Sequence, residues 1–146
     1  MEAFIIIVIV IALCFILGVS IEAILAGVMF LLAAVLLLIT VFFVLCAAKL
    51  FDSKACKAEF VKIAKSPKGN FDAAYYSIDE NEYPNVLPCE IIMRNRLYKM
   101  NRTVNVRLTK DRKFVFDKNA VAATAVGIIF GTISTTGVLF AAIQYI

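Results

Sequence analysis

Two long apolar blocks enclose a polar middle segment in this chain. The first block covers residues 3–48 and the last covers residues 120–146, and neither contains a lysine or an arginine. All fifteen Lys and Arg residues lie between Lys49 and Lys118. Apolar stretches of this length dissolve in hydrocarbon, whereas a basic segment stays in water or against lipid headgroups. The pattern therefore predicts an integral membrane protein.

The first apolar block is too long for one membrane crossing. As a single helix its roughly 46 residues would measure about 69 Å, against about 30 Å for a bilayer core. Residues 18–22 combine a helix-weakening glycine, a serine that can cap a helix and a charge, so we expect a break there. This gives one helix over residues 3–19, short for a span at about 26 Å, and a second over residues 23–48. A re-entrant first segment is the alternative.

The segment that follows, residues 49–66, is expected to be an amphipathic helix on the membrane surface. Its apolar side chains Cys56, Phe60 and Ile63 would share one helical face, with lysines on the other. A strand remains the alternative, because Phe60, Val61 and Ile63 all favour β structure.

From residue 71 onward the apolar period changes to two, which is typical of strands. Val104, Val106 and Leu108 alternate with polar residues, and the alternation returns at Phe114 and Phe116 after a turn at residues 110–112. Other strands are expected at residues 71–78, 86–93 and 97–98, the first two being separated by a polar turn at residues 79–82. We expect an antiparallel meander or partial barrel of four or five strands.

The predicted fold class is membrane α plus small β. Three transmembrane helices are expected, with the β domain inserted between the second and the third. The predicted parts are a helical hairpin at 1–48, a juxtamembrane amphipathic segment at 49–70, a small basic β domain at 71–118 and a third transmembrane helix at 119–146.

Composition and charge support this division. Hydrophobic residues make up 62% of the chain, against about 45–50% in soluble domains. Of the eleven acidic residues only Glu2 and Glu22 lie outside the middle segment, which leaves nine acidic against fifteen basic residues there, a net charge of about +6. Because basic segments beside a span are retained on the cytoplasmic side, we expect a multi-pass protein of a bacterial inner membrane, with a cytoplasmic β domain and the C-terminus outside.

Small residues recur at every fourth position of the last apolar block. Such a stripe lets two helix backbones approach closely. It could face a partner helix or the chain's own helices, and the sequence leaves both open. The predicted helix-packing residues are Ala123, Gly127, Gly131 and Thr135.

The segment 94–113 is strongly basic, because it contains eight Lys and Arg residues and one acidic residue, Asp111. Contact with anionic lipid or an acidic partner is the favoured interpretation, and a plainly solvated face is the alternative. Nucleic acid is not expected, because no recognised binding motif is present. The predicted contact residues are Arg94, Arg96, Arg102, Arg107, Arg112 and Lys113.

Catalytic chemistry has little support in the sequence. The chain contains no histidine, so the commonest partner base and zinc ligand are both missing. Cys56 and Cys89 are isolated thiols without a C-x-x-C pattern. Glu22 could be an intramembrane carboxylate, but a solvated loop residue in a hairpin turn between two helices is the simpler interpretation. We therefore expect no enzyme, no cofactor and no metal site.

Three short motifs and the final apolar block resemble a family of small uncharacterised bacterial membrane proteins. The motifs are Tyr83-Pro84-Asn85-Val86, Arg96-Leu97-Tyr98 and Val104-Asn105-Val106-Arg107-Leu108. The resemblance implies an architecture, a β domain inserted between transmembrane helices, and no activity. We expect an accessory or assembly subunit that binds membrane lipids and a membrane protein partner, or a second copy of itself. The alternative is a small transport-linked or immunity-type protein acting through its helices.

Overall fold

The computed structural model of the chain describes residues 18–91, 94–99 and 102–145, with the isolated positions 2, 5, 6, 8, 9 and 16. The chain divides into two compact units. The helical unit comprises Met1–Val41 and Ile129–Ile146, and the sheet unit comprises Phe42–Ile128. The two long helices contribute residues to both units.

Helix α2, Ile21–Phe51, begins where the sequence predicts a break in the first apolar block. Gly18 has a φ of 73°, a conformation that glycine adopts without a Cβ clash. The Ser20 hydroxyl oxygen then accepts a hydrogen bond from the Ala23 amide at 3.3 Å, as an N-cap serine does. The predicted break at residues 18–22 is confirmed.

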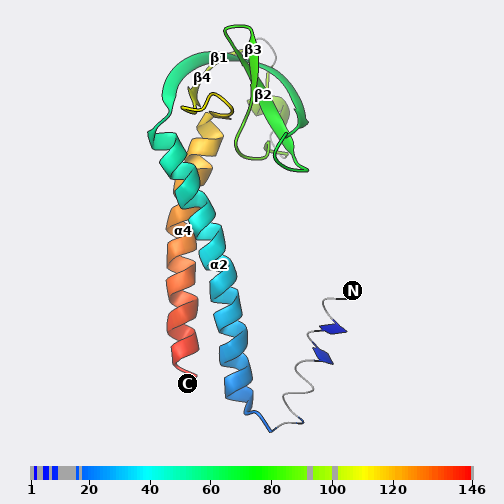
Figure 1. Cartoon of the computed structure of the whole chain (residues 1–146), viewed down its shortest axis with the longest axis vertical. Coiled ribbons are helices and arrows are strands. Elements are labelled where there is room, and N and C mark those ends of the chain that lie inside the picture. The colour runs from blue at the N-terminus through cyan, green and yellow to red at the C-terminus, as the bar shows by residue number, and fades with distance from the viewer. Residues whose placement is uncertain are drawn as a thin grey trace. The chain divides into compact units, whose positions relative to one another are not determined.

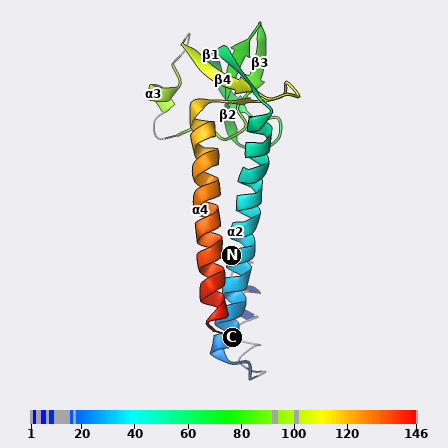
Figure 2. The ribbon, with the colours of Figure 1, turned by 90° about the vertical axis from the view of Figure 1, so that its left-hand side faces the viewer.

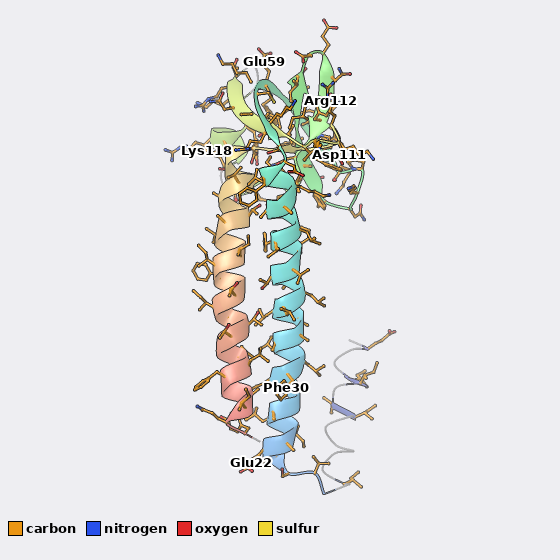
Figure 3. All side chains as sticks on the ribbon, turned by 60° about the vertical axis from the view of Figure 1, so that its left-hand side comes forward. Glu22, Phe30, Glu59, Asp111, Arg112 and Lys118 are labelled. Atoms are coloured by element: carbon orange, nitrogen blue, oxygen red, sulfur yellow. The ribbon has the colours of Figure 1, made fainter. Side chains whose placement is uncertain are left out.

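Helices α2 and α4, Lys118–Ile143, are both long and apolar enough to cross a membrane. They contain 31 and 26 residues. Only 11% of the most apolar window of each helix is buried, and Figure 3 shows mainly carbon along their side chains. Apolar side chains that no protein covers suit a lipid environment.

The prediction of three transmembrane helices is wrong. The described residues form two long apolar helices, which flank a five-stranded antiparallel half-barrel. The first predicted helix, over residues 3–19, falls largely outside the described residues. Apolar composition identifies a segment that dissolves in lipid, but it does not supply length. About 17 residues reach only about 26 Å, which is less than a bilayer core.

The sheet has the order β3-β2-β1-β4-β5, and every neighbouring pair is antiparallel. Figures 1 and 2 show the long β1 at its centre. The strands are β1 Lys54–Lys65, β2 Asp72–Ile78, β3 Asn81–Pro84, β4 Thr103–Leu108 and β5 Val115–Phe116.

Strand β1 lies where an amphipathic helix was expected, so that expectation is wrong and the strand alternative holds. Strand β1 pairs with β2 on one side and with β4 on the other, as at Cys56 opposite Val106. The register shifts between Phe60 and Lys62. This irregularity interrupts the period of two, which made the segment look helical, and the pairing partners lie too far along the chain for a local pattern to show.

Two shorter predictions between β2 and β4 are also wrong. A strand was expected over residues 86–93, but the described part of that segment is irregular, and β3 begins earlier, directly after Asp79 and Glu80. Both turn residues have positive φ, 50° and 66°, as in a tight two-residue hairpin turn. Leu97 was expected in a short strand and instead ends the short helix α3, Arg94–Leu97.

The sheet unit has two groups of buried apolar side chains. One fills the half-barrel around Phe60, Tyr76 and Val106. The other joins Phe116 of β5 to Ala120 of α4, together with Cys46 of α2 and Leu87. The strands therefore enclose one buried group of their own, and the ends of the two helices share a second group with β5.

Candidate functional site

The sheet unit presents a basic surface formed by its strands and loops. Every Lys and Arg side chain that the structure describes is exposed. Among these side chains only two form ion pairs, Lys62 with Glu82 at 2.6 Å and Lys65 with Asp72 at 3.2 Å. Most of the basic side chains thus keep a positive charge that no described carboxylate neutralises.

Three of the predicted contact residues lie just before β4. Arg94 and Arg96 belong to α3, and Arg102 precedes the first residue of β4. The side chains of Arg96 and Arg102 are exposed, whereas that of Arg94 lies outside the described residues. Arg96 and Arg102 can therefore reach an anion outside the chain.

Arg107 has a structural contact that the sequence did not indicate. Its Nε donates to the Ser53 hydroxyl oxygen at 2.9 Å, and its second terminal nitrogen donates to the Ser53 carbonyl at 3.1 Å. Ser53 lies two residues after the end of α2, and its hydroxyl donates to the carbonyl of Leu50. Charge-assisted hydrogen bonds of this kind are stronger than neutral ones. Arg107 thus holds the end of α2 against β4.

Arg112 and Lys113 lie in the turn between β4 and β5, which was predicted at residues 110–112 and is confirmed (Figure 3). The Asp111 carboxylate accepts from the Thr109 hydroxyl at 2.6 Å and from the Lys113 amide at 3.3 Å. The hydrogen bond from Thr109, followed by that from Lys113, lowers the pKa of Asp111 below its ordinary value. The two basic side chains are thus presented on a well-fixed turn.

The predicted small-residue stripe faces α2 of the same chain at two of its four positions. A Cβ on Gly127 would lie 2.5 Å from the Phe43 ring, and one on Gly131 would collide with Thr40. Thr135 is buried, and its hydroxyl donates to the Gly131 carbonyl at 2.7 Å. Ala123 is exposed. The stripe therefore supports close packing of α4 on α2, which leaves little of it for a partner helix.

A cavity of about 950 Å³ lies within the sheet unit. We call it the sheet-unit cavity. Its walls come from the last turns of α2, the first turns of α4 and the loops that follow β1, β3 and β4. Its lining includes Phe42, Phe43, Leu45, Cys46, Ala48, Lys49, Ser66, Lys68, Phe71, Asn85, Val86, Leu87, Pro88, Glu90, Tyr98, Phe114, Asn119, Ala120 and Ala123.

Few charged or polar groups line this cavity. Lys49 and Lys68 are exposed and have no ion pair among the described residues, and the Lys68 ammonium lies 4.5 Å from the centre of the Phe114 ring. Glu90 is the one carboxylate in the lining. Asn85 is 2% exposed, and its Oδ1 has no hydrogen-bond partner in the described structure. An apolar cavity with a few polar groups is the usual form of a ligand site.

A buried polar contact joins the sheet to α4. The Tyr76 hydroxyl donates to Asp117 Oδ2 at 2.8 Å, and Asp117 Oδ1 accepts from the Ala120 amide at 2.7 Å. Asp117 is therefore the N-cap of α4 and is only 5% exposed. Burial, followed by the negative charge of Asp117, raises the pKa of Tyr76 far above its ordinary value. The phenol stays protonated and keeps donating.

The described residues offer no candidate for a catalytic site or a metal site. No group of three or more His, Cys, Asp or Glu side chains gathers there. Cys46, Cys56 and Cys89 are free thiols, and Glu22 is exposed in the first turn of α2. The expected absence of an enzymatic activity and of a cofactor stays a prediction.

Sequence reasoning missed both the cavity and the contact between Tyr76 and Asp117. The cavity is lined by segments that are distant in the sequence, so no local pattern shows it. For Asp117 one signal was available, because an aspartate three residues before a helical alanine is a typical N-cap. Its second partner, Tyr76, lies 41 residues away and could not be found.

Comparison with known proteins provides no relative. No family model, no curated protein and no solved structure matches this chain. The resemblance to small bacterial membrane proteins stays a prediction, and the function must be argued from the residues themselves.

Proposed function

We propose that this chain is a non-enzymatic integral membrane protein, an accessory or assembly subunit anchored by α2 and α4. Its sheet unit binds anionic lipid or an acidic partner, and its helices contact a membrane partner or a second copy of the chain. The observation that carries this proposal is the exposed basic surface, in which only two of the described basic side chains have an ion-pair partner.

The charge of the sheet unit supports an anionic partner. A lysine or arginine near an anionic membrane surface contributes about 1 kcal/mol. Arg96, Arg102, Arg112 and Lys113 are all exposed and come from α3, the start of β4 and the β4–β5 turn. Together they would contribute roughly 4 kcal/mol at low ionic strength, enough to hold an acidic segment or a patch of headgroups.

The proposed location follows from the same charges. The sheet unit lies between the two apolar helices in the chain, so two crossings would put both helix ends that join it on one side. The positive-inside rule assigns that side to the cytoplasm and the C-terminus to the outside. A C-terminal alkaline phosphatase fusion should then be active and a C-terminal green fluorescent protein fusion dark. The reverse result would overturn this orientation.

Photo-crosslinking in cells tests the binding role. A photoreactive amino acid at Lys113, on the β4–β5 turn, should give an adduct with an anionic lipid or with an acidic segment of one membrane protein. The matched position is Glu80, on the β2–β3 turn, where acidic residues should keep such a partner away. The double variant Arg102→Gln/Arg112→Gln should reduce the Lys113 adduct several-fold. Equal adducts at Lys113 and Glu80 would contradict the proposal.

A further inference from the structure

We infer that the sheet-unit cavity binds one anionic phospholipid, with an acyl chain among its apolar side chains and the phosphate on Lys49 and Lys68. The inference rests on the proposed function only in taking α2 and α4 to span a membrane. It differs from that function in its site, because the cavity is separate from the exposed arginines of the β4 region.

Counting along the helices places the cavity at the depth of the lipid headgroups. A bilayer core is crossed by about 20 helical residues. Counted from Ala23, such a stretch of α2 ends at Phe42, and counted back from Ile143 the same length of α4 ends at Thr124. Both helices therefore continue beyond the core. The cavity is lined by these extra turns, at Phe43, Leu45, Cys46, Ala48 and Lys49 of α2 and at Asn119, Ala120 and Ala123 of α4.

The apolar part of the lining suits an acyl chain. Phe71, Leu87 and Phe114 come from the sheet side, and Phe43 comes from α2. The volume of about 950 Å³ is at the upper end of the range of about 300–1,000 Å³ for small-molecule sites. Filling an open apolar space with a hydrocarbon chain is favourable, because each buried methylene contributes about 0.8 kcal/mol.

The charges at the cavity favour an anion. Lys49 and Lys68 together outweigh Glu90 by one positive charge, and neither lysine has an ion-pair partner among the described side chains. A lysine ammonium is a common ligand of a phosphate group. A zwitterionic headgroup adds a cation beside the phosphate and so loses this net attraction. A lipid with a net negative charge should therefore bind more tightly.

Asn85 is a second, independent sign of an unfilled site. It lines the cavity and is 2% exposed, yet its Oδ1 accepts no hydrogen bond in the described structure. Buried acceptors without partners are rare in folded proteins. The glycerol hydroxyls of a phosphatidylglycerol headgroup are donors of the kind this acceptor lacks, so we choose this lipid as the probe.

Native mass spectrometry of the full chain in detergent can measure the binding. The chain is mixed with phosphatidylglycerol or with phosphatidylcholine of the same acyl composition, and the singly bound fraction is titrated. We expect phosphatidylglycerol to bind about tenfold more tightly. The variant Lys49→Gln/Lys68→Gln should lose most of this preference. The matched variant Lys54→Gln/Lys57→Gln removes two exposed lysines of β1 that do not line the cavity, and it should keep the preference.

Two variants of α4 test the acyl-chain part of the site. Ala123 is exposed and lines the cavity, so Ala123→Phe should fill it and lower phosphatidylglycerol binding about tenfold. Ala122 is equally exposed but does not line the cavity, and Ala122→Phe should bind like the unmodified chain. Because both positions are exposed, neither change should prevent folding, and the circular dichroism spectrum verifies this.

Several results would overturn the inference. These are equal binding of the two lipids, unchanged binding by Ala123→Phe, or displacement of the lipid by millimolar inorganic phosphate, which would indicate an anion site without a chain site. If Arg102→Gln/Arg112→Gln abolishes lipid binding while the cavity variants do not, the proposed function stands and the cavity inference fails. If only the cavity variants abolish lipid binding, the cavity inference stands, and the arginines are not needed for this binding.

Discussion

Large apolar side chains have opposite environments in the two units of this molecule. In the helical unit Leu31 and Leu38 of α2 are 71% and 70% exposed. In the sheet unit Val106 and Phe116 are 1% and 0% exposed, while every lysine and arginine side chain that the structure describes there is exposed. The sheet unit is thus built for water, whereas the apolar surface of the helices fits the lipid that the proposed membrane location would provide. Large apolar side chains stabilise the fold of the sheet unit because protein buries them, whereas those on the surface of the helical unit have no such cover.

The comparison also separates two kinds of information in the sequence. In the helices composition carries most of the signal, since α2 is apolar at nearly every position and α4 has no charged residue after Lys118. In the sheet the signal is the alternation of apolar and polar positions, together with contacts between distant residues. Substitutions in the two units can test this contrast.

The largest difference in unfolding free energy is expected between substitutions of two phenylalanines, one in each unit. Phe116 is fully buried in β5, whereas Phe140 of α4 is 67% exposed. Phe116→Ala should lower the free energy of unfolding by about 3–5 kcal/mol, because it leaves a cavity in the core. Phe140→Ala should change it by less than about 1 kcal/mol. Urea titration of the full chain in detergent, followed by near-ultraviolet circular dichroism, measures both. Similar losses would contradict the contrast between the units.

The next effect concerns the polar contact at the start of α4. Asp117→Ala removes both the helix cap and the acceptor of the Tyr76 hydroxyl. It should cost about 3 kcal/mol of unfolding free energy, the sum of a lost N-cap and a hydrogen bond to a charged group. The same urea titration measures this. Asp117→Asn keeps an acceptor and should cost clearly less, so equal losses would show that hydrogen bonding at this position is unimportant.

A smaller effect is expected at Gly127, where α4 packs against α2. Gly127→Ala would put a methyl group against the Phe43 ring and should lower the free energy of unfolding by about 1–2 kcal/mol. Gly137 of the same helix has open space around its Cα, so Gly137→Ala should be neutral or stabilising by up to about 1 kcal/mol. Thermal unfolding in detergent compares the two. A stabilising Gly127→Ala would show that the helices do not pack at this point.

The smallest effect is a loss of stability at high pH. The pKa of Tyr76 is raised in the folded chain, so the unfolded chain releases its proton first as the pH rises above about 10. The contribution of Tyr76 is therefore complete below pH 10 and falls above it, by about 1 kcal/mol between pH 9 and pH 11. Urea titrations at both pH values should show that Tyr76→Phe lacks this part of the decrease. An identical pH dependence in both proteins would contradict the assignment of this loss of stability to the buried Tyr76 hydroxyl.

Part of the fold could be predicted from the sequence. The break before α2 was found because glycine and serine have specific roles at a helix start, and β4 was found because Val104, Val106 and Leu108 alternate without interruption. Apolar length predicted α4 well. Each of these features is decided by neighbouring residues.

The remaining features depend on contacts that a single sequence does not reveal. Strand β1 is interrupted by a register shift, and its partners are 7 to 54 residues away in the sequence. The predicted number of long helices was wrong because the first predicted helix, with about 17 residues, was counted as a span although it is shorter than a bilayer core. Of the candidate site, the exposure of Arg96 and Arg102 agrees with the sequence, whereas the contact of Arg107 with Ser53 and the cavity required the three-dimensional arrangement.

The ends of the half-barrel have a consequence for neighbouring copies in a membrane. Its outer strands are short, four residues in β3 and two in β5. They meet through a parallel bridge between Asn85 and Val115, in which the Val86 amide also donates to the Val115 carbonyl. Little free strand edge is left for β pairing between chains. In the proposed membrane setting, molecules that collide often in two dimensions could therefore remain separate at high density, without fusing their sheets into aggregates.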